Sequence, residues 1–121
     1  MTAASTYLAV FAGSRSSPRW RAWEALSAAE RQAKEQAGLA AWSAWTERHG
    51  NAILVPGGPL GKAQHIDGEG RRDLSNTLCA FVVVRADSPQ AAAQMFAQHP
   101  HFTIFPGDAI EVMPILAVPS A

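Results

Sequence analysis

Short runs of branched and aromatic residues predict three β-strands along the chain. The first, Ser5–Ala12, carries apolar side chains on both faces, so both faces are expected to be covered. The second, Leu78–Val84, is continuously apolar, which is typical of a central strand buried on both sides. The third, about Ala109–Ala117, contains Pro114, which cannot donate a ladder hydrogen bond and therefore predicts a position near a sheet edge.

The middle of the chain gives a weaker strand pattern. Ala52–Val55 is predicted to be a short strand that the following Pro-Gly-Gly-Pro run breaks, with Ala63–Ile66 as its candidate hairpin partner. Gly68–Asp73 is expected to be a loop. His65 and Asp67 lie two residues apart in an extended segment, so they point to the same side and form a weak candidate acid/base or metal pair.

Two helices are predicted between these strands. Ser27 and Glu30 form a capping box, which starts a helix that runs to about Arg48 and stops at Gly50. Small residues form a narrow stripe on this helix that is expected to face a sheet: Ala33, Ala37, Ala40 and Ala44. Ser88 and Pro89 open a second helix, Pro89–Gln98, which Pro100 is expected to end.

Tryptophans mark the surfaces that need a cover. Trp42 falls on the polar side of the long helix, away from the alanine stripe, so a neighbouring loop or a second subunit is expected to cover it. The segment Ser14–Trp23 is predicted to be a loop, with Trp20 and Trp23 interleaved with arginines. This loop either covers a pocket that receives an anion or simply covers core or partner surface.

Composition narrows the classes of function. The chain has 121 residues, of which 48% are hydrophobic, and is predicted to form a single domain over residues 1–121. Its 10 basic and 10 acidic residues cancel, so nucleic-acid binding is not expected. The single cysteine, Cys79, excludes an internal disulfide. Neither a signal peptide nor a stretch of ~20 apolar residues is found, so a cytoplasmic protein without a membrane partner is expected.

The order of elements predicts the fold class. Strand, helix, two strands, helix and strand form a βαββαβ pattern, which predicts an α+β, ferredoxin-like fold with an antiparallel sheet and both helices on one face. The helices can cover only one face, yet the first and central strands are apolar on both. A second copy packing sheet against sheet would cover the other face, so a homodimer is expected.

A series of short motifs lies in order from about Leu39 onward. They are Trp42-x-x-Trp45, Gly57-Gly58-Pro59-Leu60, Ser88 to Ala92, His99-Pro100, and Gly107-x-x-Ile110-Glu111-Val112-x-Pro114-Ile115. Their order and spacing resemble the YCII-related family of small dimeric α/β-barrel proteins with ferredoxin-like topology. The resemblance implies similarity to cofactor-independent lyases or dehydrochlorinases of small ring compounds, in which a His/Asp pair is the proposed catalytic couple.

The chain departs from that family pattern in three places. It has no histidine near the start of the long helix, and it carries His99 where some relatives carry an acidic residue before the proline. Asp67-Gly68-Glu69-Gly70 stands in the region of the Asp-Gly-Pro-Phe signature. The catalytic couple of the relatives therefore does not transfer intact to this chain.

The turn His99–Asp108 gathers the side chains best suited to chemistry. Histidine titrates near neutrality, so His99 and His101 are candidate acid/base residues, with Asp108 or Glu111 as the carboxylate that orients the ring. The candidate catalytic set is His99, His101 and Asp108, and the candidate substrate contacts are Trp42, Trp20 and Glu111. The expected function is small-molecule binding near the two histidines, without a cofactor or metal.

Two alternatives to an acid/base enzyme stay open. In the first, the histidines are structural, and the chain is a non-enzymatic, dimeric ligand-binding or accessory domain. In the second, His99 and His101 bind a metal ion, which requires Asp108 or Glu111 to complete the coordination shell because two nitrogen ligands are too few.

Overall fold

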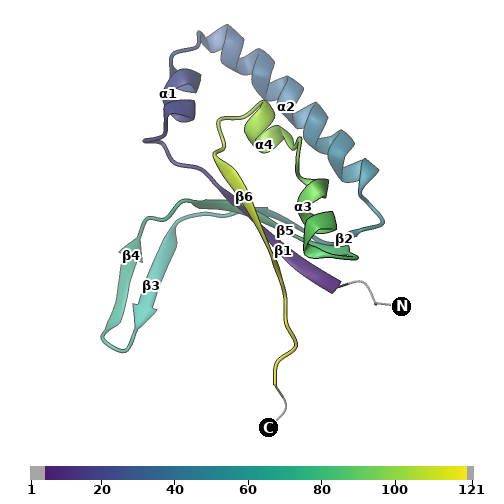
Figure 1. Ribbon diagram of the computed structural model, residues 1–121. Helices are drawn as coiled ribbons and strands as arrows, with labels where there is room; N and C mark the ends of the chain where they lie inside the picture. The colour runs from purple at the N-terminus through teal and green to yellow at the C-terminus, as the bar shows by residue number, and fades with distance from the viewer. Residues whose placement is uncertain (1–4, 120–121) are drawn as a thin grey trace.

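The computed structural model describes residues 5–119 and contains a four-stranded antiparallel sheet with helices on one face (Figure 1). The strands are β1 (Ser5–Ala12), β2 (Ile53–Pro59), β5 (Leu78–Ala86) and β6 (Ala109–Pro114), in the spatial order β2-β5-β1-β6. The helices are α1 (Pro18–Glu24), α2 (Ala28–Arg48), α3 (Pro89–Met95) and α4 (Pro100–Thr103). A separate hairpin consists of β3 (Ala63–Asp67) and β4 (Gly70–Leu74). This arrangement confirms the predicted ferredoxin-like α+β fold.

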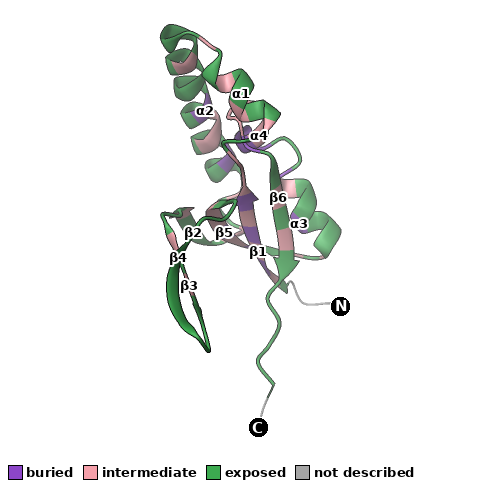
Figure 2. Cartoon of the chain, turned by 90° about the vertical axis from the view of Figure 1, so that its left-hand side faces the viewer, coloured by how far each residue is buried: buried purple, intermediate pink, exposed green. Residues whose placement is uncertain are grey.

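The core lies between the sheet and the helices. Tyr7, Ala9 and Phe11 of β1 are buried there, and Val82 and Val84 of β5 are buried beside them. β5 pairs with both β2 and β1, which confirms the predicted central position of this strand. β6 is an edge strand, as Pro114 predicted. The opposite sheet face carries no helix (Figure 2).

The long helix α2 begins at the predicted capping box. The Ser27 hydroxyl accepts a hydrogen bond from the Glu30 N–H, and the Glu30 carboxylate accepts one from the Ser27 N–H. The predicted orientation of the helix is wrong, because the four stripe alanines are exposed and Gly38 and Trp45 are buried. Trp42 also faces the sheet, where its ring stacks on Phe11 at 5.4 Å. Large indoles fill the space between helix and sheet and bury more apolar area than alanine can.

The predicted loop Ser14–Trp23 is in part the helix α1. The Ser17 side chain accepts a hydrogen bond from the Trp20 N–H, and Pro18 occupies the first helical position. These two features start the helix. Trp20 and Trp23 are half-buried on it. The helix packs against α4 and the segment after it, where the Trp23 ring lies 6.0 Å from that of Phe105 and Arg19 donates to the Phe102 carbonyl oxygen.

The middle segment differs most from its prediction. β2 continues through the predicted break to Pro59, because Gly57 adopts a φ of +67° within a bulged register. A Cβ at Gly57 would lie 1.9 Å from the Phe81 carbonyl oxygen, so only glycine fits. The candidate partner Ala63–Ile66 does not pair with β2. It pairs instead with β4, most of which lies within the region predicted as loop.

Two element ends in the last third also differ. The second helix stops at Met95, and His99–Pro100 starts the short helix α4 rather than only ending the one before it. The last strand ends at Pro114 instead of Ala117. Within residues 5–119, none of the helices has the length and apolar character needed to cross a membrane.

Candidate functional site

A cavity of about 480 Å³ lies between α2 and the helix-covered face of β2 and β5. Its walls are almost entirely apolar and come from α2, β1, β2, β5 and the segment after α4. The side chains include Leu39, Trp42, Trp45, Phe11, Ile53, Val82 and Phe105, together with His101. The predicted contact Trp42 is therefore brought to the same cavity as the predicted catalytic residue His101.

His101 is buried at the end of β1, with a relative exposure of 5%. Its Nε2 lies 2.8 Å from the Ala12 carbonyl oxygen, which can only accept, so Nε2 carries the proton in the neutral ring. Burial lowers the pKa of His101, while the Ala12 and Ala109 carbonyls and the Asp108 carboxylate act in the opposite direction. The neutral ring keeps a lone pair on Nδ1, which is able to accept a proton.

Gly107 makes room for the His101 ring. A Cβ at Gly107 would lie 2.2 Å from Cε1 of His101, and the Gly107 N–H donates to the His101 carbonyl oxygen at 2.9 Å. Any side chain at this position would push the imidazole away. The Gly107 motif, which contributed to the family resemblance, thus has a direct role in holding His101.

His99 lies behind His101 and has no exposed surface. It caps α4, with its Nδ1 accepting a hydrogen bond from the His101 N–H at 3.0 Å. Burial lowers its pKa to about 3, with a smaller effect from His101. The ring is therefore neutral, and its Nε2 has no hydrogen-bond partner among the described residues.

Aromatic rings surround His99 and supply an alternative partner. Trp42, Trp45 and Phe11 meet the imidazole edge to face, at centroid distances of 4.4, 4.8 and 5.0 Å. Aromatic faces are weak acceptors for N–H donors. His99 does not line the cavity itself. It lies behind His101 and supports that residue through the hydrogen bond from its N–H.

A second cavity of about 360 Å³ lies on the other side of His101, between the end of β1 and α1. Its walls include Ser14, Arg15, Trp20, Cys79 and His101. The guanidinium carbon of Arg15 lies 5.5 Å from the centroid of the Trp20 ring. Cys79 donates its thiol hydrogen bond to the Phe11 carbonyl oxygen at 3.2 Å, and burial raises its pKa. The predicted contact Trp20 is thus brought to this cavity and not to the first.

The two predicted carboxylates lie outside both cavities. Asp108 is exposed, and its Oδ2 accepts a hydrogen bond from the Ser14 N–H at 3.1 Å. No hydrogen bond joins the Asp108 carboxylate to a described histidine, although its charge acts on His101. Glu111 is exposed and pairs with Val10, on the sheet face away from the helices. Its ligand contact stays a prediction.

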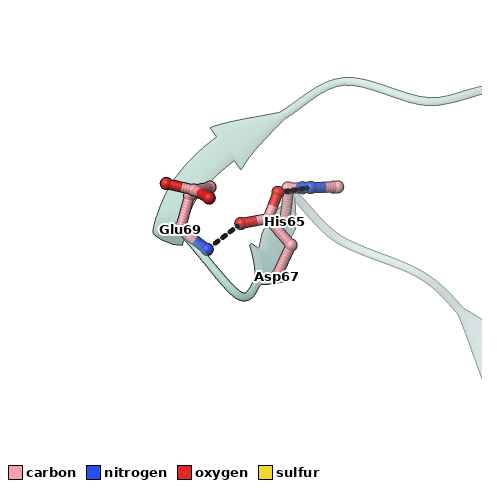
Figure 3. Close-up of polar contacts among 3 residues, drawn as sticks. All are labelled: His65, Asp67 and Glu69. Carbon is pink, nitrogen blue, oxygen red and sulfur yellow. Dashed lines mark hydrogen bonds and ion pairs between the residues drawn. The ribbon is translucent and has the colours of Figure 1, made fainter.

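The pair His65 and Asp67 lies in the β3–β4 hairpin and lines neither cavity. His65 Nε2 is 2.8 Å from Asp67 Oδ2, and Asp67 Oδ1 accepts a hydrogen bond from the Glu69 N–H (Figure 3). These contacts lower the pKa of Asp67. Asp67 thus closes the β3–β4 turn, and the prediction that the two side chains point the same way is confirmed.

The metal alternative receives no support from the geometry. In the described part of the chain, no group of three His, Cys, Asp or Glu side chains is placed to hold an ion. Sequence reasoning missed most of the cavity residues, among them Leu39, Phe105 and Arg15. Phe105 lines both cavities, and its position next to the glycine turn was the only available signal.

No protein-family model matches the chain, and no curated protein matches it in sequence. A solved structure shares its fold: the 5-chloro-2-hydroxyhydroquinone dehydrochlorinase of Burkholderia phenoliruptrix, in complex with 2,5-dihydroxybenzoquinone, aligns with a TM-score of 0.52. The likeness covers 89% of this chain and 90% of that chain, at 19% sequence identity. It supports the predicted ferredoxin-like architecture at the level of the fold alone.

Proposed function

We propose that this protein binds a small, mainly apolar ring compound between α2 and β2, and that His101 exchanges a proton with it. One observation supports this most: His101 is the only titratable side chain among the residues that line the 480 Å³ cavity. That volume lies in the range of ~300–1,000 Å³ typical of small-molecule sites. A mainly apolar wall with one titratable group gives both affinity and a fixed point for orientation.

The reaction proposed is the elimination of chloride from a chlorinated, hydroxylated ring, by analogy of fold with the dehydrochlorinase. Neutral His101 accepts a proton from the substrate, the electron pair left behind forms a new double bond, and chloride leaves with the electrons of its bond to carbon. A base that is neutral at pH 7 suits this step. His99 is proposed as a positioning residue, and Asp108 as the charge that favours protonated His101.

The proposal is tested with chlorinated and hydroxylated benzenes and quinones. We expect these compounds to raise the melting temperature and to release chloride. Leu39→Trp, at a position 65% exposed, should fill the cavity mouth and abolish binding. His101→Ala and His99→Ala should weaken the ligand-dependent stabilisation while circular dichroism shows an intact fold. Binding without chloride release would overturn the elimination reaction.

A non-enzymatic ligand-binding domain is the second candidate. The observation in its favour is that His101 already donates to the Ala12 carbonyl and is almost fully buried, which suits a structural role. In that case His101→Gln should leave ligand affinity within about twofold. A flat response to the whole ligand panel would contradict ligand binding in this cavity altogether.

A homodimer is also proposed, since one sheet face lacks a cover. Met113, Leu8, Val83 and Val55 form a row across that face. Met113 and Val55 are 40% and 45% exposed. The hairpin β3–β4 and the segment after β6 extend from the sheet on the side away from the helices (Figures 1 and 2). A second copy packed on this face would bury the row.

A further inference from the structure

We infer a second ligand site, for a small planar organic anion such as an aryl carboxylate, in the cavity between α1 and the end of β1. This site is separate from the ring-binding cavity proposed above. Its volume of about 360 Å³ is enough for one substituted ring. The two cavities share the side chains of His101 and Phe105 and differ in the rest of their walls.

Arg15 supplies the charge. Its side chain makes no ion pair in the structure, since the only ion pair within residues 5–119 joins His65 to Asp67. The position of the guanidinium over the Trp20 ring, at 5.5 Å, leaves its planar edge able to donate two parallel hydrogen bonds to a carboxylate. A cation that lines a cavity and makes no ion pair among the described residues is suited to an anionic ligand.

The other walls fit a planar ring. Trp20 and Phe105 are half-buried and offer aromatic surface for stacking. The Cys79 thiol is kept neutral, because burial raises its pKa, so it does not repel an anion. Asp108 is the nearby carboxylate, but it does not line the cavity, and the Ser14 N–H occupies its Oδ2.

Benzoate and its neutral isostere benzamide test this site by titration calorimetry. We expect the unmodified protein to bind benzoate about tenfold more tightly than benzamide, since charge-assisted hydrogen bonds are the stronger ones. Arg15→Gln should remove this preference, and Arg15→Lys should restore part of it. Arg21→Gln changes an exposed arginine of α1 that does not line the cavity, and should leave the preference intact.

Leu39→Trp separates this site from the first cavity. Leu39 lines the cavity beneath α2 and not the cavity beside α1. This variant should therefore keep its affinity for benzoate and lose its affinity for the chlorinated and hydroxylated rings. Loss of benzoate binding in Leu39→Trp would place the anion in the first cavity and overturn the inference. Equal affinities for benzoate and benzamide, a preference that survives Arg15→Gln, or no binding of either probe would also overturn it.

Discussion

His101 is held on three sides by contacts that leave its ring little freedom. Its Nε2 donates to Ala12, its backbone N–H donates to His99, and Gly107 packs against the ring. A side chain that lies between two cavities and is fixed in this way is pre-organised for a ligand on either side. The orientation of the His101 ring therefore depends on its neighbours, and its proposed role depends on that orientation.

Gly107→Ala tests this packing. The added methyl overlaps the imidazole, so we expect a loss of about 1–3 kcal/mol in the free energy of unfolding, together with weaker ligand binding. Urea denaturation measures the first effect. Gly61→Ala is the matched control, because nothing lies within 4 Å of a Cβ at that position. Equal stability of the two variants would contradict the proposed packing role.

The buried histidines predict a dependence of stability on pH. Burial lowers the pKa of His99 to about 3, against 6.5 for an unperturbed ring, and it lowers that of His101 in the same direction. Below pH 6.5 the unfolded chain therefore binds protons that the folded chain does not. The free energy of unfolding should be highest above pH 6.5 and fall as the pH drops. His99 alone should contribute a slope of up to ~1.4 kcal/mol per pH unit down to about pH 3, and His101 should add to the fall in the same direction.

His99→Asn separates the contribution of His99 to this pH dependence from that of His101. Asparagine can still accept the hydrogen bond from the His101 N–H, but it does not titrate. Denaturation between pH 4 and pH 7 should therefore show a shallower slope in this variant than in the unmodified protein. An unchanged slope would mean that His99 is not the source of the effect.

Among the elements, α2 has the largest role, because it forms the roof of the first cavity. Its capping box fixes where the helix starts. The choice between the alanine face and the tryptophan face is made by packing against Phe11 and Phe96, at 5.4 Å from Trp42 and 5.0 Å from Trp45. Trp45 also donates from Nε1 to the Met95 carbonyl at 2.7 Å, which ties α2 to α3.

Ser27→Ala should weaken this helix at its start. The substitution removes the hydroxyl that accepts from the Glu30 N–H, and we expect a loss of about 1 kcal/mol in stability. Thermal unfolding followed by circular dichroism measures the effect. Ser43→Ala, at an exposed position inside the same helix, should change stability little or increase it slightly. Similar losses in both variants would rule out the cap as the cause.

At the scale of the whole molecule, the uncovered sheet face predicts self-association. Sedimentation at micromolar concentration should show a dimer. Leu8→Lys places a charge in the middle of the apolar row and should give a folded monomer. Ala33→Lys adds a charge at an exposed position of α2, on the helix side of the sheet, and serves as the control. A monomer in the unmodified protein would contradict the dimer.

The sequence by itself determined the parts that depend on local chemistry. Strand runs with branched residues, the Ser27 capping box and the Ser88-Pro89 start all act within a few residues, so β1, β5, β6 and both helix starts were predictable. The order of these elements then restricted the topology to a ferredoxin-like sheet. The same local information placed His101 and Asp108 in one turn before the last strand.

Only the tertiary structure decided which faces meet. Trp42 turned toward the sheet, β3 paired with β4, and β2 continued through Gly57, because each outcome depends on partners distant in sequence. For the same reason, His99 and His101 look equivalent in the sequence, yet one is enclosed by aromatic rings and the other lines two cavities. Burial and cavity walls are properties of the packed chain, and no single segment contains them.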